Sequence, residues 1–180
     1  WAFAPVSRTW TKLTTSESSG TGRILRPRAF QGLTVVQPGN RVFAFGGEGF
    51  DGNPLQVLAF EDLWELVGTT WTDRTPSGPL GSQHGACANS SLCPGIGAWR
   101  AFAFDPVGNR LVTQGGYPFD HSKTWAFGLG SSAWSVVTTV LGNASLATRD
   151  SHAMVWDSAG SRLVLYGGYL SDLWTLAGGG

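Results

Sequence analysis

One pattern recurs three times without gaps, and it constrains the fold more than any other feature of the chain. In each copy a glycine lies two residues before an arginine, and two glycines lie five and six residues after it. The arginines are Arg41, Arg110 and Arg162. The glycine pairs are Gly46 and Gly47, Gly115 and Gly116, and Gly167 and Gly168. Such self-similarity indicates an architecture built from copies of one supersecondary unit.

Each copy predicts a β-hairpin. Gly-Asn or Gly-Ser before the arginine supplies the positive φ that a tight turn needs. The first strands are expected within 29–37, 99–105 and 152–157, and the second within 42–45, 111–114 and 163–166. Their nearly continuous apolar character is typical of sheets covered on both faces. The glycine pair then ends the second strand, where a side chain would obstruct a neighbouring backbone.

Tryptophans mark a third and a fourth strand after each glycine pair. The marked positions are Trp64 and Trp71, Trp125 and Trp134, and Trp174, with half a copy at Trp1 and Trp10. Because they recur in phase with the repeat, we expect these rings to pack between sheets rather than stack on a ligand. An amphipathic helix is the alternative for 55–66, where four leucines fall near one face.

These features resemble the kelch repeat, in which a glycine pair closes the second strand, an aromatic residue lies in the third and a tryptophan in the fourth. His152 matches the family's frequent first-strand histidine, whereas the same column holds Gln31 and Arg100. The resemblance implies an all-β fold, a β-propeller of four-stranded antiparallel blades. Its segments would be the end of one blade at 1–14, full blades at 28–75 and 97–139, a partial blade at 149–177, and a long inter-blade loop at 76–98.

The expected strands number about 13, which is not a whole number of four-stranded blades. Trp1 and Trp174 would compete for one place if the two ends joined in a single blade. Three blades are also fewer than closed rings usually have. We therefore expect an arc of a larger ring of six or seven blades. Further blades of the same protein, or a partner chain, would complete it.

Composition and charge narrow the function classes. Twelve basic and twelve acidic residues give a formal net charge of zero, so no electrostatic argument favours a nucleic-acid partner. No apolar run is long enough for a membrane span. The 26 glycines fit hairpin turns and strand ends better than helices.

The two cysteines and two glycosylation sequences favour an extracellular, secreted or cell-surface protein. Cys87 and Cys93 lie in one loop and are expected to form a disulfide; two reduced thiols are the alternative. A metal site there would have only His84 as a further nearby ligand. Asn89 and Asn143 each begin an N-glycosylation acceptor sequence in a predicted loop.

No catalytic, cofactor or metal constellation emerges from the sequence, so no cofactor is predicted. His152 is expected to be structural, and Asp105 and Asp157 to serve hairpin turns. Glu61 and Asp62 are interpreted as a solvated strand start. The kelch resemblance also reaches galactose oxidase, whose copper site requires tyrosine, histidine and a tyrosine-linked cysteine, and no residues here match that pattern.

The sequence therefore favours a non-enzymatic interaction or assembly module. The predicted contacts lie in loops at Phe50, Asp51, Asn53, His84, Tyr117, Phe119 and Tyr169. The alternatives are a glycan-binding propeller that uses the loop aromatics, and the non-catalytic part of a galactose-oxidase-like enzyme.

Overall fold

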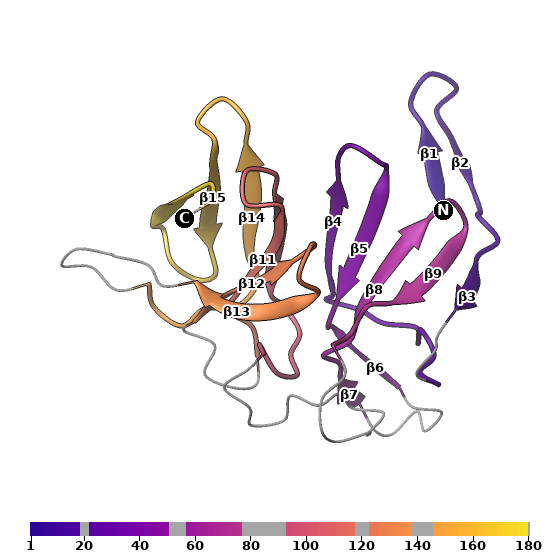
Figure 1. Ribbon diagram of the computed structural model, residues 1–180, viewed down its shortest axis with the longest axis horizontal. Coiled ribbons are helices and arrows are strands. Elements are labelled where there is room, and N and C mark those ends of the chain that lie inside the picture. The colour runs from indigo at the N-terminus through magenta and orange to yellow at the C-terminus, as the bar shows by residue number, and fades with distance from the viewer. Residues whose placement is uncertain (19–21, 51–56, 77–92, 118–122, 138–145, 180) are drawn as a thin grey trace.

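The computed structural model describes residues 1–18, 22–50, 57–76, 93–117, 123–137 and 146–179, and over these ranges the chain is all-β (Figure 1). The described residues contain sixteen strands and no helix. The all-β class predicted from the repeat is therefore confirmed.

The predicted hairpins form three successive antiparallel sheets. The first contains β4 (Gly32–Val36), β5 (Arg41–Phe45), β8 (Leu63–Val67) and β9 (Thr70–Asp73). The second contains β10 (Ala101–Asp105), β11 (Arg110–Gln114), β12 (Thr124–Gly128) and β13 (Ala133–Val137). The third contains β14 (His152–Asp157), β15 (Arg162–Gly167) and β16 (Leu173–Ala177). We call them the first, second and third repeat sheets.

The predicted turn chemistry is present at the tip of each first hairpin. Asn40, Asn109 and Ser161 all have positive φ, at 51°, 46° and 47°. These short polar side chains tolerate the left-handed conformation, so each turn reverses the chain directly before its arginine.

One hairpin and one strand depart from the sequence expectation. The loop at 48–61 contains an extra hairpin of β6 (Glu48–Phe50) and β7 (Val57–Ala59). The described part of 55–66 holds β7 and the start of β8 and no helix, so the alternative helix is wrong there. Strand β3 (Ser16–Ser18) pairs in parallel with β9 and gives the first sheet a fifth strand. Strand β3 is short and polar and has no apolar alternation, so no sequence pattern predicts it.

The N-terminal hairpin corrects the expectation for two tryptophans. Strands β1 (Ala2–Ala4) and β2 (Thr9–Thr11) form a two-stranded sheet of their own, at the opposite end of the molecule from the C-terminus (Figure 1). Trp1 is 73% exposed and Trp10 is 66% exposed, so the core role predicted for them is wrong. Trp174 lies on β16 of the third repeat sheet and Trp1 precedes β1, so the two tryptophans do not compete for one place in a single sheet.

The core lies between successive repeat sheets. Phe43, Phe45 and Leu63 of the first sheet pack with Phe102, Phe104 and Leu111 of the second. Val112 and Ala126 on the other face of the second sheet pack with Leu163 of the third. The first strands β4, β10 and β14 also lie side by side in that order. The second sheet is therefore covered on both faces, which explains its continuously buried strands.

The glycine pairs join each sheet to the next repeat. The Gly47 N–H donates to the Gly97 carbonyl at 3.0 Å, and the Gly116 N–H donates to the Arg149 carbonyl at 2.9 Å. A Cβ at Gly46 would lie 2.7 Å from the Gly97 oxygen, and one at Gly115 would clash with the Arg149 oxygen. The first glycine of these pairs is thus required because the next repeat's backbone approaches so closely.

Gly167 offers a matched control for this requirement, because a Cβ there would meet no atom within 4 Å. Alanine at either Gly115 or Gly167 adopts a left-handed φ, which costs about 1–2 kcal/mol. Gly115→Ala adds a backbone clash worth about 1–3 kcal/mol. We therefore expect urea unfolding to show a larger loss of stability for Gly115→Ala. Equal losses would contradict the close approach.

Candidate functional site

Asp105 and Asp157 hold their hairpin turns, as the sequence predicted. Asp105 Oδ1 accepts from the Val107 and Gly108 N–H groups, both at 3.0 Å, and its Oδ2 accepts from Arg110 Nε at 2.9 Å. Asp157 makes the same three contacts in the third sheet, with distances of 3.0–3.1 Å. Burial raises the pKa of Asp105, but hydrogen bonds from Gly179, Gly108 and Arg110 outweigh it and lower the pKa overall. These carboxylates serve the turns and are poor candidates for acid–base chemistry.

An arginine, an aspartate and a tryptophan form the same network in the first and third repeats. Arg28 donates to both carboxylate oxygens of Asp62, at 2.6 and 2.8 Å, and Trp64 Nε1 donates to Asp62 at 2.6 Å. Arg28 also donates to the Gly46 carbonyl at 3.0 Å. This network ties the segment before the first strand to the glycine pair and the third strand. The interpretation of Glu61 and Asp62 as a solvated strand start is therefore wrong.

The third repeat reproduces each of these contacts. Arg149 donates to both oxygens of Asp172 at 2.7 and 2.8 Å and to the Gly167 carbonyl at 3.1 Å. The hydrogen bond from Arg149 and the one from Trp174 Nε1 hold the pKa of Asp172 well below its usual range. No local sequence pattern indicates this pair, because its members lie 23 residues apart, one before β14 and the other before β16.

The second repeat replaces both members of the pair together. Gly97 occupies the arginine column and Lys123 the aspartate column. A Cβ at Gly97 would lie 2.6 Å from Nε of Arg100, so the guanidinium of Arg100 takes the space of the missing side chain. Arg100 donates to the carbonyls of Pro94, Gly95 and Ile96 at 3.0, 3.1 and 2.8 Å. Burial lowers its pKa to about 9, against the opposing charge of Glu61, so it stays protonated at neutral pH.

His152 is buried, which agrees with its predicted structural role. Burial and then the charge of Arg149 lower its pKa to about 4, while the backbones of Asp150 and Gln114 and the Asp150 carboxylate act in the opposite direction. The ring is therefore neutral at pH 7 and packs against Gly115, whose Cβ position lies 2.5 Å from its Cε1.

Several predicted site residues lie outside the described residues. They are Asp51, Asn53, His84, Cys87, Asn89, Phe119 and Asn143. Cys93 is described and buried, but its predicted partner is not described, so the disulfide stays a prediction. Phe50 lies on β6 and is half exposed.

Two predicted contact residues do come together. Tyr117 and Tyr169 each follow a glycine pair, and with Trp99, Asp150 and Ser151 they line a cavity of about 330 Å³. We call these five residues the aromatic pocket. Trp99 and Ser151 occupy the same column of successive repeats and share a positive φ, at 54° and 57°. The Ser151 N–H donates to the Trp99 carbonyl at 2.9 Å, so the pocket spans the joint between the second and third repeats.

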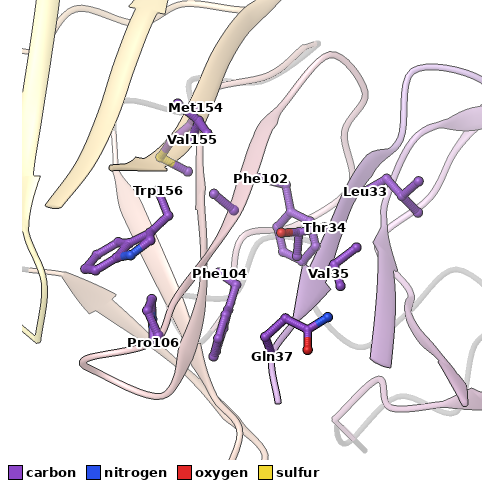
Figure 2. A pocket seen from close by; sticks show the side chains of 11 residues that line it. Leu33, Thr34, Val35, Gln37, Phe102, Phe104, Pro106, Met154, Val155 and Trp156 are labelled. Atoms are coloured by element: carbon purple, nitrogen blue, oxygen red, sulfur yellow. The ribbon is translucent and has the colours of Figure 1, made fainter. Parts of the chain in front are cut away.

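A second concavity lies over the first strands of all three sheets (Figure 2). This inner groove has a volume of about 480 Å³. Phe102 and Phe104 lie between Leu33 and Val35 on one side and Met154 and Trp156 on the other (Figure 2). None of its lining residues is titratable. The inner groove can therefore bind apolar groups but cannot supply a general acid or base.

Neither the described side chains nor a comparison with known proteins assigns the chain to a family. Within the described ranges no three histidine, cysteine, aspartate or glutamate side chains gather as a metal site. The same residues include no helix of the length and apolar character that a membrane crossing requires. No family model matches the chain, and no curated protein sequence matches it.

The Arg28–Asp62 pair should contribute strongly to stability, because its side chains are only 6% and 13% exposed. Asp62→Asn leaves the buried Arg28 charge without its counterion, and we expect a loss of roughly 3 kcal/mol in unfolding free energy. Most of this loss reflects the unpaired charge, so the double variant Arg28→Met, Asp62→Asn should recover part of it in urea titrations. A double variant less stable than Asp62→Asn would contradict this assignment.

His152 predicts a pH dependence of stability. Its pKa is about 4 in the folded chain against 6.5 ordinarily, so the unfolded chain binds the proton more readily. The stability from this group is complete above pH 6.5 and declines as the pH falls towards about 4. His152→Gln, which copies the first repeat's Gln31, should remove this component. Parallel stability curves for the two proteins between pH 7 and 4 would refute it.

Proposed function

We propose that the chain is part of a kelch-type β-propeller, and that it serves outside the cell as a non-enzymatic module for protein–protein interaction or structural assembly. Three observations support the propeller. The sheets repeat one strand order, each sheet packs on the next, and the first strands lie side by side as innermost blade strands would.

The observation that carries the interaction role is the outer face of the third repeat sheet. Side chains alternate along each strand, and Met154, Trp156 and Leu163 point towards the second sheet. The opposite side chains therefore point away from it. We call these residues the outer face, and they are Val155, Val164, Tyr166, Leu173 and Thr175.

The same positions in the second sheet show what the outer face is suited to contact. Ala103 is 4% exposed where its counterpart Val155 is 62% exposed. Gln114 is 1% exposed against 55% for Tyr166, and Thr124 is 8% exposed against 64% for Leu173. The third sheet thus presents, uncovered, the face that the second sheet buries against its successor. An exposed apolar patch of this kind marks an interaction surface.

The partner that fits this surface is another sheet of the same repeat. It would come from further blades of the same protein or from a partner chain, and the ring would then be larger than the three sheets described. Gly167 also leaves open the space that the next repeat's backbone fills beside Gly46 and Gly115.

Self-association of the chain tests this proposal. We expect concentration-dependent association in sedimentation velocity experiments, because burying the outer face removes apolar surface from water. Val155→Asp should suppress the association, whereas Val6→Asp should not, since Val6 is 99% exposed at the tip of the N-terminal hairpin. A chain that stays monomeric at millimolar concentration, or equal effects of the two variants, would contradict the proposal.

The extracellular location has its own test. Intact mass measured without reduction, after expression through a eukaryotic secretory pathway, should show the loss of two hydrogens at Cys87 and Cys93 and glycans at Asn89 and Asn143. Labelling of both cysteines by a thiol reagent in the folded, unreduced protein would exclude the disulfide.

A further inference from the structure

The aromatic pocket exists because one position of the repeat changes from an aromatic residue to serine. In the second repeat the Trp99 ring lies 4.8 Å from Phe30 of the repeat before it and 5.7 Å from Tyr117 of its own repeat. Ser151 holds the position of Trp99 in the third repeat, and Tyr169 holds that of Tyr117. A ring at residue 151 would by this correspondence lie between Trp99 and Tyr169. Serine leaves that space open as the cavity of about 330 Å³.

The walls of this space are aromatic, and the Trp99 wall is held by rings on two sides. Trp99 is held between Phe30 and Tyr117, with its indole edge-on to the Tyr117 ring at 62°. Tyr169 has a left-handed φ of 64°, and its side chain is 90% exposed although it lines the pocket. A bulky residue rarely adopts this conformation, and such outliers concentrate at ligand sites.

Asp150 gives the pocket a negative charge. Its Oδ1 accepts from the hydroxyl of Ser151 at 2.8 Å, so the hydroxyl is already engaged. The neighbouring cation, Arg149, has a fully buried side chain and is paired with Asp172. The pocket therefore combines three aromatic rings with one carboxylate and places no cation among its lining residues.

We propose that the aromatic pocket binds an organic cation whose head group is a quaternary or methylated ammonium. Aromatic faces attract such cations through the ring quadrupole, and a nearby carboxylate adds direct charge attraction. A pyranose could also stack on Trp99, but it needs several polar partners for its hydroxyls, and here the Ser151 hydroxyl is already engaged. This site is separate from the outer face, so it does not depend on the proposed function.

The test compares two probes of equal shape and different charge. Choline carries a trimethylammonium group, and 3,3-dimethylbutan-1-ol is its neutral carbon isostere. We expect choline to shift the Trp99 indole N–H resonance in two-dimensional NMR titrations of the whole chain. It should bind at least about fivefold more tightly than the isostere, which is the ratio that a cation–π contribution of about 1 kcal/mol gives.

Three variants separate the pocket from general effects. Asp150→Asn should weaken choline at least about fivefold and leave the isostere unchanged, because only the charge is removed. Ser151→Trp restores the ring of the second repeat and should abolish choline binding. Ser132→Trp is its matched control, since Ser132 is an exposed serine with a φ of 52° on the turn between β12 and β13, and it should bind as the parent does. Circular dichroism establishes that each variant is folded.

Four results would overturn the proposal. These are equal affinity for choline and its isostere, unchanged choline binding by Ser151→Trp, tighter binding of methyl glucoside than of choline, and no shift of Trp99 with choline at any soluble concentration. The third would assign the pocket to sugars. Monomeric behaviour of the chain in sedimentation bears on the outer face alone.

Discussion

The fold depends on the hydrogen bond from the second glycine of a pair to a carbonyl of the next repeat. It forms twice, between Gly47 and Gly97 and between Gly116 and Arg149. It holds successive first strands side by side, and this spacing lets the second sheet bury both faces. The same close approach requires glycine at the first position of these pairs, because a Cβ there would clash with the carbonyl of the next repeat. The spacing of the repeat is therefore set by backbone contacts, and side chains are freer to differ.

That freedom explains how the repeats diverge. The Arg–Asp–Trp network secures the first and third repeats, while the second replaces the pair with Gly97 and Lys123 and fills the space with Arg100. An analogous change from Trp99 to Ser151 leaves space unfilled and forms the aromatic pocket. Arg100 fills the space left at Gly97, whereas none of the described residues fills the space left at Ser151. A repeat of this kind can thus acquire a binding site by losing one ring.

The features that the sequence predicted are those encoded locally. The turns at Asn40, Asn109 and Ser161, the strands beside them and the turn roles of Asp105 and Asp157 follow from residues close together in the chain. The members of the Arg28–Asp62 pair lie 34 residues apart, and the pocket around Trp99 joins two repeats, so no local sequence pattern predicts either. Trp10 shows the converse: it is in phase with the half-buried Trp71 and Trp134, but it is 66% exposed because no sheet of the described residues covers it. Whether such a tryptophan is buried depends on a neighbouring sheet, which its own position in the repeat does not indicate.

Amide hydrogen exchange at three glycines tests whether these hydrogen bonds join successive repeats. The amides of Gly47 and Gly116 donate across the joints between repeats, whereas among the described residues no later repeat offers a carbonyl to Gly168. In NMR measurements at a concentration too low for self-association, we expect slow exchange at Gly47 and Gly116 and much faster exchange at Gly168. Equal rates at the three positions, or slowest exchange at Gly168, would contradict this expectation.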